Sequence, residues 1–139
     1  MPAIYVHRHV VRPDEIDRLG HANNLAYLRW MLEAAVAHSA AQGWDSAAYE
    51  QLGAVFVVRS HQIEYLRPAF AAEVVEISTW VASFRRASSV RRYAMRRAGE
   101  DKLLATAATE WAFVDLATRL PTRIHPRVIE AFQVTEGPA

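Results

Sequence analysis

The sequence contains no cysteine among its 139 residues. Disulfide bridges, thiolate nucleophiles and zinc sites with cysteine ligands are therefore excluded. Glycine is scarce as well, and the five glycines form no Gly-x-Ser-x-Gly, Walker or dinucleotide-binding pattern. A serine hydrolase of that kind, a P-loop nucleotidase and a nicotinamide-dependent enzyme thus lack their usual sequence signatures.

Neither sign of charge is in excess, since 16 Lys and Arg residues face 15 Asp and Glu residues, giving a formal net charge of +1. This balance argues against a basic nucleic-acid-binding protein, and 52% hydrophobic residues argue against disorder. No apolar run is long enough to span a bilayer, and no basic region precedes an apolar stretch at the N-terminus. We therefore expect a single domain over residues 1–139, a cytoplasmic location, and neither a nucleic-acid nor a membrane partner.

The longest helical pattern runs from residue 24 to residue 41. Asn23 or Asn24 is a suitable N-cap, and Gly43 is a suitable residue just beyond the C-terminus. Apolar residues occupy almost every side, which is typical of a buried helix. Only a narrow polar stripe remains, which consists of Arg29, Glu33, His38 and Gln42.

Strand patterns flank this helix on both sides. The segments with β-branched residues or alternating hydrophobicity are 4–12, 55–66, 73–84, 88–97 and 102–115. Shorter helical segments are expected at 44–51 and 126–132. One strand, a central helix and then four strands predict an α+β fold in which a largely antiparallel sheet wraps around the helix. His7 and His9 share a strand face, but without a third ligand at suitable spacing we expect no metal site.

Directly before the long helix lies an acidic and amide-rich loop that contains Asp17, Gly20, His21 and Asn23. The N-terminus of a buried helix presents unpaired N–H groups and a partial positive charge, which suit a carbonyl oxygen. An aspartate beside it can act as a nucleophile on an activated acyl carbon or as a general base for water. Alternatively, Asp17 only caps a turn.

The run Asp17-x-x-Gly20-His21-x-Asn23-Asn24-x-x-Tyr27-Leu28-x-Trp30 resembles the opening motif of the hotdog-fold thioesterases, in the 4-hydroxybenzoyl-CoA thioesterase-like branch of the acyl-CoA thioesterases. The resemblance continues through residues 63–69, 84–88 and 114–121 and so covers essentially the whole chain. It implies the hotdog fold, a five-stranded antiparallel sheet wrapped around a long central helix. It also implies thioester hydrolysis without a cofactor, since coenzyme A is part of the substrate.

The resemblance implies a role for each matching residue. Asp17 aligns with the catalytic carboxylate, and the backbone N–H of Asn24 aligns with the group that polarises the thioester carbonyl. Gly20 lets the chain approach the substrate closely. Arg85 and Arg86 align with basic residues that hold the nucleotide phosphates of coenzyme A.

Two departures from the family pattern limit what can be transferred. Ala87 stands where closely related enzymes have a further basic residue. His21, Asn23 and Asn24 replace apolar and aromatic residues of the hydroxybenzoyl enzymes, so an aromatic substrate is not implied. We take His21 as a catalytic candidate and Asn23 as a substrate-binding candidate.

Tyr27 and His61 are further substrate-binding candidates, and each has a structural alternative. Tyr27 is equally consistent with a core or subunit-interface residue, and His61 with a hydrogen-bonded strand histidine. For His21 the alternative is a hydrogen bond within its loop, and for Arg85 and Arg86 it is a solvated basic patch.

Three other functions stay open beside acyl-CoA hydrolysis. They are an acyl-carrier-protein thioesterase, a hydratase or dehydratase that uses Asp17 and His21 as an acid–base pair, and a noncatalytic acyl-binding homologue. Strand 73–84 is apolar on both sides, with Val74, Trp80 and Phe84 opposite Val75, Ile77 and Val81. Together with the resemblance, this predicts a homodimer or a dimer of dimers, that is a homotetramer, with active sites at the subunit interface.

Overall fold

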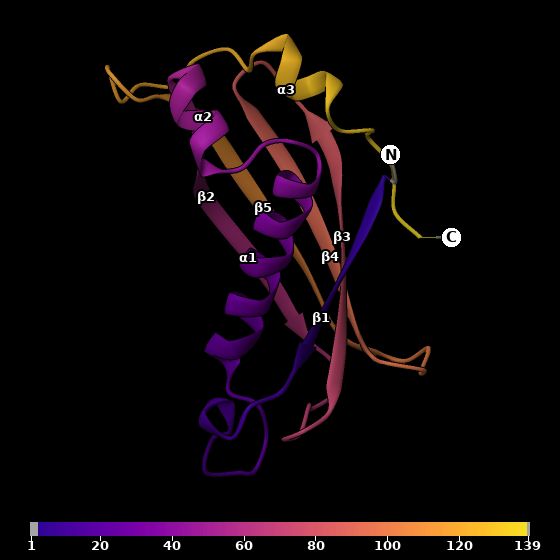
Figure 1. Ribbon diagram of the computed structural model, residues 1–139. Helices are drawn as coiled ribbons and strands as arrows, with labels where there is room; N and C mark the ends of the chain where they lie inside the picture. Colours follow the sequence, from indigo (N-terminus) through magenta and orange to yellow (C-terminus); the bar gives the residue numbers. More distant parts are fainter. Residues whose placement is uncertain (1–2, 139) are drawn as a thin grey trace.

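The computed structural model describes residues 3–138 (Figure 1). The order of elements is the predicted one, and each boundary lies within a few residues of its expected place. The elements are β1 (Ile4–Val10), η1 (Pro13–Glu15), α1 (Asn24–Ala41), α2 (Ser46–Leu52), β2 (Ala54–Tyr65), β3 (Val74–Phe84), β4 (Ser88–Arg97), β5 (Leu103–Asp115) and α3 (Pro126–Glu130).

The strands form one antiparallel five-stranded sheet in the order β1-β3-β4-β5-β2. Figure 1 shows α1 lying along one face of this sheet, with α2 and α3 gathered at the end where α1 terminates. The α+β prediction of an antiparallel sheet packed on a central helix is confirmed. Strands β1 and β2 are the two edges, and each has a strand neighbour on one side only among the described residues. No helix of the described chain is both long and apolar enough to cross a membrane.

Local sequence signals fix both ends of α1. Asn23 has an extended backbone, and its Oδ1 accepts a hydrogen bond of 2.8 Å from the N–H of Ala26, so Asn23 is the N-cap. Beyond the last turn, Gly43 takes a left-handed φ of +90°, which glycine adopts without steric cost. The helix therefore spans Asn24–Ala41, as predicted.

Burial of α1 differs from the expectation. The helix packs on the sheet through one face only, and Leu25 and Val36 on the other face are 74% and 63% exposed. The prediction of a helix buried on almost every side is therefore wrong for the single chain, because one sheet can cover only one side of a helix. His38, predicted on the polar stripe, is 2% exposed and faces the sheet layer.

The buried side chains fall into two clusters, one toward each end of the sheet. The larger cluster joins the first part of α1 to the middle strands and includes Trp30, Met31 and Tyr93. The smaller one lies under α2 and α3 and includes Trp44, Phe113 and Phe132. The two ends of α1 consequently lie in different surroundings.

The segment after α3 covers part of the outer face of the sheet. The N–H of Thr135 donates to the carbonyl of Val81 at 3.1 Å, and a Cβ added to Gly137 would lie 2.5 Å from the ring of Trp80. Trp80 is therefore only 6% exposed and is covered by its own chain rather than left open for a partner.

Candidate active site

Asp17 lies in a tight loop between η1 and α1. A β-bridge between Ile16 and Ala22 closes the base of the loop. The N–H of Asp17 donates to the carbonyl of His21 at 2.8 Å, and the N–H of Gly20 donates to the carbonyl of Asp17 at 3.1 Å. Gly20 has a φ of +85°, a conformation that L side chains rarely adopt. The turn around Asp17 thus depends on glycine at this position.

The two carboxylate oxygens of Asp17 have different surroundings. Oδ1 accepts hydrogen bonds from the backbone N–H groups of Leu19 at 2.8 Å and His21 at 3.3 Å. Oδ2 has no hydrogen-bond partner within residues 3–138, and the side chain is exposed. Asp17 therefore caps the turn through Oδ1, as the structural alternative predicts, while Oδ2 is free to take part in a reaction.

The start of α1 lies directly after this loop. The backbone N–H groups of Asn24 and Leu25 donate to no acceptor in the described part of the chain, as is usual for a first helical turn. The carbonyl of Asn24 accepts a hydrogen bond of 3.1 Å from the hydroxyl of Tyr65, which ties the helix start to the end of β2. A partly positive, hydrogen-bond-donating helix end and a carboxylate therefore occur within eight residues of sequence.

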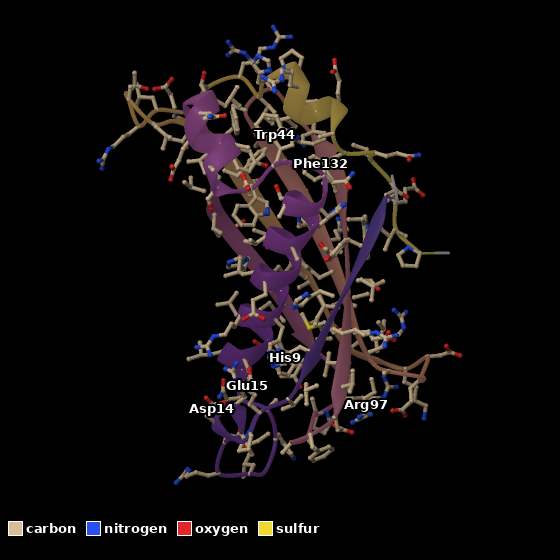
Figure 2. The ribbon with its side chains drawn as sticks, viewed as in Figure 1. His9, Asp14, Glu15, Trp44, Arg97 and Phe132 are labelled. Carbon is tan, nitrogen blue, oxygen red and sulfur yellow. The ribbon has the colours of Figure 1, made fainter. Side chains whose placement is uncertain are left out.

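Glu15 holds the loop in place, and sequence reasoning missed it. Its carboxylate accepts hydrogen bonds from Trp30 Nε1 at 2.8 Å and from the N–H of Arg12 at 2.9 Å, and lies 2.7 Å from His9 Nε2. Its carbonyl accepts both the N–H and the side-chain amide of Asn23, at 2.8 and 3.0 Å. Figure 2 shows Glu15 and His9 together near the start of α1.

The charge of Glu15 is stabilised despite burial, since the residue is 3% exposed. Burial raises its pKa, but the hydrogen bonds from His9, the Arg12 backbone and Trp30 outweigh this and lower the pKa below its usual value. Nothing in the hydrophobic periodicity distinguished Glu15 from its exposed neighbour Asp14. Its position six residues after His9 was the available signal.

His21 and Tyr27 make contacts that serve the loop and the core. The ring of His21 meets the ring of Phe70 edge-on, with centroids 5.5 Å apart, and His21 reaches Asp17 only through its backbone N–H and carbonyl. Tyr27 is 3% exposed, and its hydroxyl accepts a hydrogen bond of 3.1 Å from the N–H of Ala69. A substrate contact for either side chain stays a prediction.

His61 lies in the middle of β2, where its Nδ1 is 2.8 Å from the hydroxyl oxygen of Thr109 on β5. Burial lowers the pKa of His61. The ring thus has a partner within the sheet, and its predicted contact with substrate stays a prediction. Within residues 3–138, no group of three or more His, Asp or Glu side chains is arranged to hold a metal ion.

Arg85 and Arg86 form the exposed turn between β3 and β4, and their side chains make no hydrogen bond or ion pair within the described residues. This turn and the Asp17 loop lie at opposite ends of β3. Val10, shortly before the loop, pairs with Val74 at the first residue of β3, whereas the arginines follow its last residue. At 3.3 Å per residue the strand spans about 33 Å. One chain alone therefore does not bring the two predicted parts of the site together.

Comparison with protein families gives the class of the protein. The model of the thioesterase-like superfamily matches residues 11–132. The chain belongs to that superfamily. No curated protein sequence matches it significantly.

Solved structures show the same fold. A hypothetical protein from Thermus thermophilus is 26% identical, with a TM-score of 0.84 over 92% of this chain and 96% of that one. A DHNA-CoA thioesterase from Staphylococcus aureus is 25% identical, with a TM-score of 0.83 over 92% and 87% of the two chains. A hypothetical Staphylococcus aureus protein in complex with CoA is 12% identical, with a TM-score of 0.87 over 97% and 89%. The predicted hotdog fold is confirmed.

Proposed function

We propose that the protein is an acyl-CoA thioesterase in which Asp17 is the catalytic carboxylate. The observation that carries this proposal is that Asp17 Oδ2 has no partner within residues 3–138 and lies in the loop directly before the unpaired N–H groups of Asn24 and Leu25, in a chain of the thioesterase-like superfamily. A thioester carbonyl is activated enough for one carboxylate and one hydrogen-bond donor to suffice.

Each group has a defined part in the reaction. Asp17 either attacks the carbonyl carbon or takes a proton from the attacking water, and the N–H of Asn24 stabilises the negative charge that develops on the carbonyl oxygen. On the general-base route the carbon–sulfur bond then breaks, the thiolate takes up a proton and leaves as coenzyme A, and the acyl group leaves as the free acid with the oxygen of the water. On the nucleophilic route the same bond cleavage leaves a mixed anhydride between the acyl group and Asp17, which water then hydrolyses to the free acid and the regenerated carboxylate. The partial positive charge at the N-terminus of α1 also stabilises the negative charge on the carbonyl oxygen.

Coenzyme A is favoured over a carrier protein as the acyl donor. Arg85 and Arg86 are exposed and free of partners within residues 3–138, so their guanidinium groups can donate hydrogen bonds to phosphate oxygens. The similar Staphylococcus aureus protein was determined in complex with CoA, and another is a DHNA-CoA thioesterase. The net charge of +1 gives no strong field for an acidic protein partner.

A second copy of the chain would unite the two parts of the site. Strand β2 is an edge, and Val57 and Val58 on it are 43% and 41% exposed. If two β2 strands pair antiparallel about a two-fold axis, the Arg85–Arg86 end of one copy comes beside the Asp17 end of the other. A homodimer, or a dimer of dimers, is therefore part of the proposal. Light scattering that shows a monomer at micromolar concentration would contradict it.

The function is tested by incubating the protein with saturated and enoyl thioesters. Release of free thiol identifies the thioesterase, a change at the double bond identifies a hydratase, and binding without turnover identifies an acyl-binding homologue. We expect thiol release. The absence of a side-chain contact between His21 and Asp17 disfavours a hydratase, since that reaction needs an acid–base pair at one carbon.

A further inference from the structure

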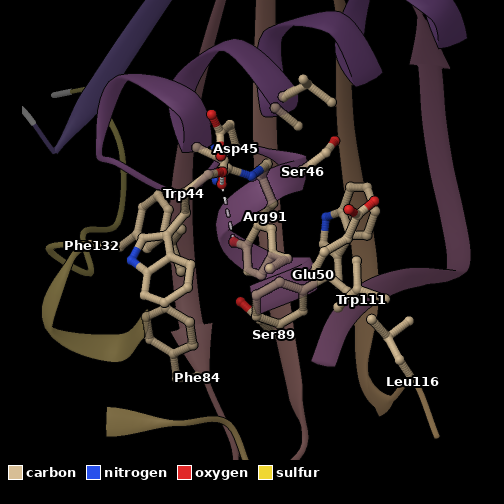
Figure 3. Close-up of a pocket in the computed structure, with 17 residues that line it drawn as sticks. Trp44, Asp45, Ser46, Glu50, Phe84, Ser89, Arg91, Trp111, Leu116 and Phe132 are labelled. Atoms are coloured by element: carbon tan, nitrogen blue, oxygen red, sulfur yellow. Dashed lines mark hydrogen bonds between the residues drawn. The ribbon is translucent and has the colours of Figure 1, made fainter. Parts of the chain in front are cut away.

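A cavity of about 310 Å³ lies at the end of α1 opposite to Asp17. It is bounded by the second half of α1, by α2 and by the inner face of the sheet, and Figure 3 shows the side chains that line it. Six of the lining residues are aromatic, namely Trp44, Tyr49, Phe56, Phe84, Trp111 and Phe132. Val36, which is 63% exposed, lies at its rim.

One charged side chain is buried in this wall. Arg91 on β4 is 6% exposed, and its Nη1 donates hydrogen bonds to His38 Nδ1 at 2.8 Å and to Thr79 Oγ1 at 3.1 Å. Its Cζ lies 5.8 Å from the centre of the Phe132 ring. Figure 3 shows Arg91 between the side of the cavity formed by Trp44 and Phe132 and the side formed by Trp111.

No carboxylate of residues 3–138 forms an ion pair with Arg91. Its hydrogen-bond partner does not compensate the charge, because burial and the charge of Arg91 lower the pKa of His38 to about 4, which leaves the imidazole neutral at pH 7. Burying an unpaired charge is costly, and proteins seldom do so without a use for it.

The free side of the guanidinium indicates what it binds. With Nη1 engaged by His38 and Thr79, Nε and Nη2 make no hydrogen bond to any described residue. These two nitrogens present parallel N–H groups, the arrangement that binds both oxygens of a carboxylate.

We propose that this cavity binds a small apolar carboxylate, with the carboxylate on the Nε–Nη2 edge of Arg91 and the apolar body against the aromatic wall. The cavity volume equals that of about ten waters in the liquid, which sets the ligand at roughly ten non-hydrogen atoms. The proposal does not rest on thioesterase activity, because binding is measured without turnover.

Two carboxylates also line the cavity and must be weighed against an anionic ligand. Asp45 and Glu50 are both exposed, and Asp45 Oδ1 already accepts the N–H of Ala48 as the cap of α2. Solvent and salt screen these outer charges, whereas the buried guanidinium acts in a low-dielectric wall. The inner end of the cavity, at Arg91, therefore favours an anion. The outer end, at Asp45 and Glu50, would repel a second negative charge, so a ligand with a single carboxylate is favoured over a dianion.

The test is isothermal titration calorimetry with phenylacetate and with phenylacetamide, which have the same size and differ in charge. We expect the native protein to bind phenylacetate about tenfold or more tightly, since a charge-assisted bidentate hydrogen bond is lost with the amide. Arg91→Met should abolish this preference. Arg92→Met, a change at the exposed neighbour on the same strand, should leave it unchanged.

Equal affinity of the native protein for acid and amide, or a preference that persists in Arg91→Met, would overturn the proposal. Should circular dichroism show that Arg91→Met does not fold, the acid-to-amide ratio of the native protein and the Val36→Trp variant decide. Val36→Trp narrows the rim and should weaken phenylacetate binding severalfold. Unchanged affinity in that variant would place the ligand elsewhere.

The carboxylate could belong to a free acid or to the far end of an acyl group. A second experiment distinguishes these two sources by comparing the hydrolysis of glutaryl-CoA, which has a terminal carboxylate, with that of pentanoyl-CoA, which has none. A preference of the native protein for glutaryl-CoA that Arg91→Met removes assigns the cavity to the far end of an acyl group. No such preference, with phenylacetate binding retained, assigns it to a free acid. If neither thioester is hydrolysed, calorimetry still decides whether the carboxylate site exists.

Discussion

The two ends of α1 contrast in almost every physical respect. At the N-terminal end, a hydrogen-bonded loop presents the exposed carboxylate of Asp17 to solvent. At the C-terminal end, a neutral histidine and an arginine are buried among aromatic rings. The first end is built from residues close in sequence, whereas His38 and Arg91 are 53 positions apart. A motif search can find the first kind of site but not the second.

The contrast also concerns the cost of charge. Asp17 is exposed to solvent. Arg91 is removed from water and is supported by only two hydrogen bonds from the described chain. Substitution of the exposed Asp17 should therefore change chemistry more than stability, and substitution of the buried His38 or Arg91 should do the reverse.

The largest effect is expected for Asp17→Asn. The amide keeps the shape of the side chain and one acceptor oxygen for the loop, but removes the nucleophilic or basic oxygen. Thioester turnover should fall by about 100- to 1000-fold, while the melting temperature changes little. Stopped assays of free thiol with a panel of acyl-CoA substrates measure this.

Asp14→Asn is the matched control, because Asp14 is exposed, acidic and only three residues away. It should retain turnover within about twofold, as expected for a surface change away from the chemistry. Near-normal turnover of Asp17→Asn across the panel would show that another group catalyses the reaction.

The second-largest effect is expected for the stability of the protein at acid pH, and it depends on His38 near the C-terminal end of α1. The pKa of His38 is about 4 when folded and 6.5 in the unfolded chain, so between these values the unfolded state binds more protons and stability falls as pH falls. The loss should reach about 3 kcal/mol at the lower pH. Urea unfolding of the native protein and of His38→Gln at several pH values measures it.

The native protein should lose stability between pH 6.5 and 4 more steeply than His38→Gln, whatever their difference at pH 7. His125→Asn, a change at an exposed histidine that caps α3, serves as the control and should keep the native slope. Parallel profiles for the native protein and His38→Gln would show that His38 titrates normally in the folded state.

The order of elements and most boundaries could be predicted because each depends on local signals. Asn23 and Gly43 mark the ends of α1, and β-branched residues mark the strands. The exposure of Leu25 and Val36 could not be predicted, because the sequence does not show whether an apolar side chain packs on the sheet or faces solvent. Which helix face meets the sheet is decided by packing at long range.

The candidate site shows the same division. Asp17, Gly20 and Asn23 lie in one short loop, and the structure places them together. Arg85 and Arg86 were grouped with them by resemblance, yet they lie at the other end of the sheet in one chain. Sequence order carries no information on such distances, so the link between the two parts remains a proposal that depends on a second copy.

A smaller effect is expected for Glu15→Gln, which tests how the loop at the N-terminal end is held. The amide keeps the volume but loses one acceptor for His9, Trp30 or Arg12 N–H, which should destabilise the fold by about 2 kcal/mol. Glu64→Gln, at an exposed glutamate, should change stability by less than about 0.5 kcal/mol.

The pH dependence checks the same residue. The pKa of Glu15 is lowered on folding, so its stabilising contribution is present above the usual glutamate pKa of 4.5 and is lost as pH falls below it. The difference in unfolding free energy between the native protein and Glu15→Gln should therefore shrink at acid pH. A constant difference would mean that the charge of Glu15 is not what matters.

The smallest effect is expected for substitution of Arg85 and Arg86. This variant tests whether these arginines, at one end of the sheet, act in the same reaction as Asp17, at the other end. In Arg85→Ala/Arg86→Ala, KM for acyl-CoA should rise by about tenfold with kcat nearly unchanged, because phosphate contacts remote from the carbonyl contribute similarly in ground and transition states. Arg92→Ala, which removes an exposed cation in the middle of β4, should leave KM unchanged.

The same acyl chain offered on coenzyme A, on a carrier protein and on a truncated pantetheine thiol gives the decisive comparison. If Arg85 and Arg86 hold phosphates, the native protein should use coenzyme A more efficiently than the truncated thiol, and the double variant should lose most of that advantage. Equal efficiency with both would separate the arginines from the reaction, and a large preference for the carrier protein would replace coenzyme A as the donor. Because Arg85 and the Asp17 loop lie at opposite ends of β3 in one chain, and this strand spans about 33 Å, an advantage found only in the dimeric form would show that the site is shared between copies.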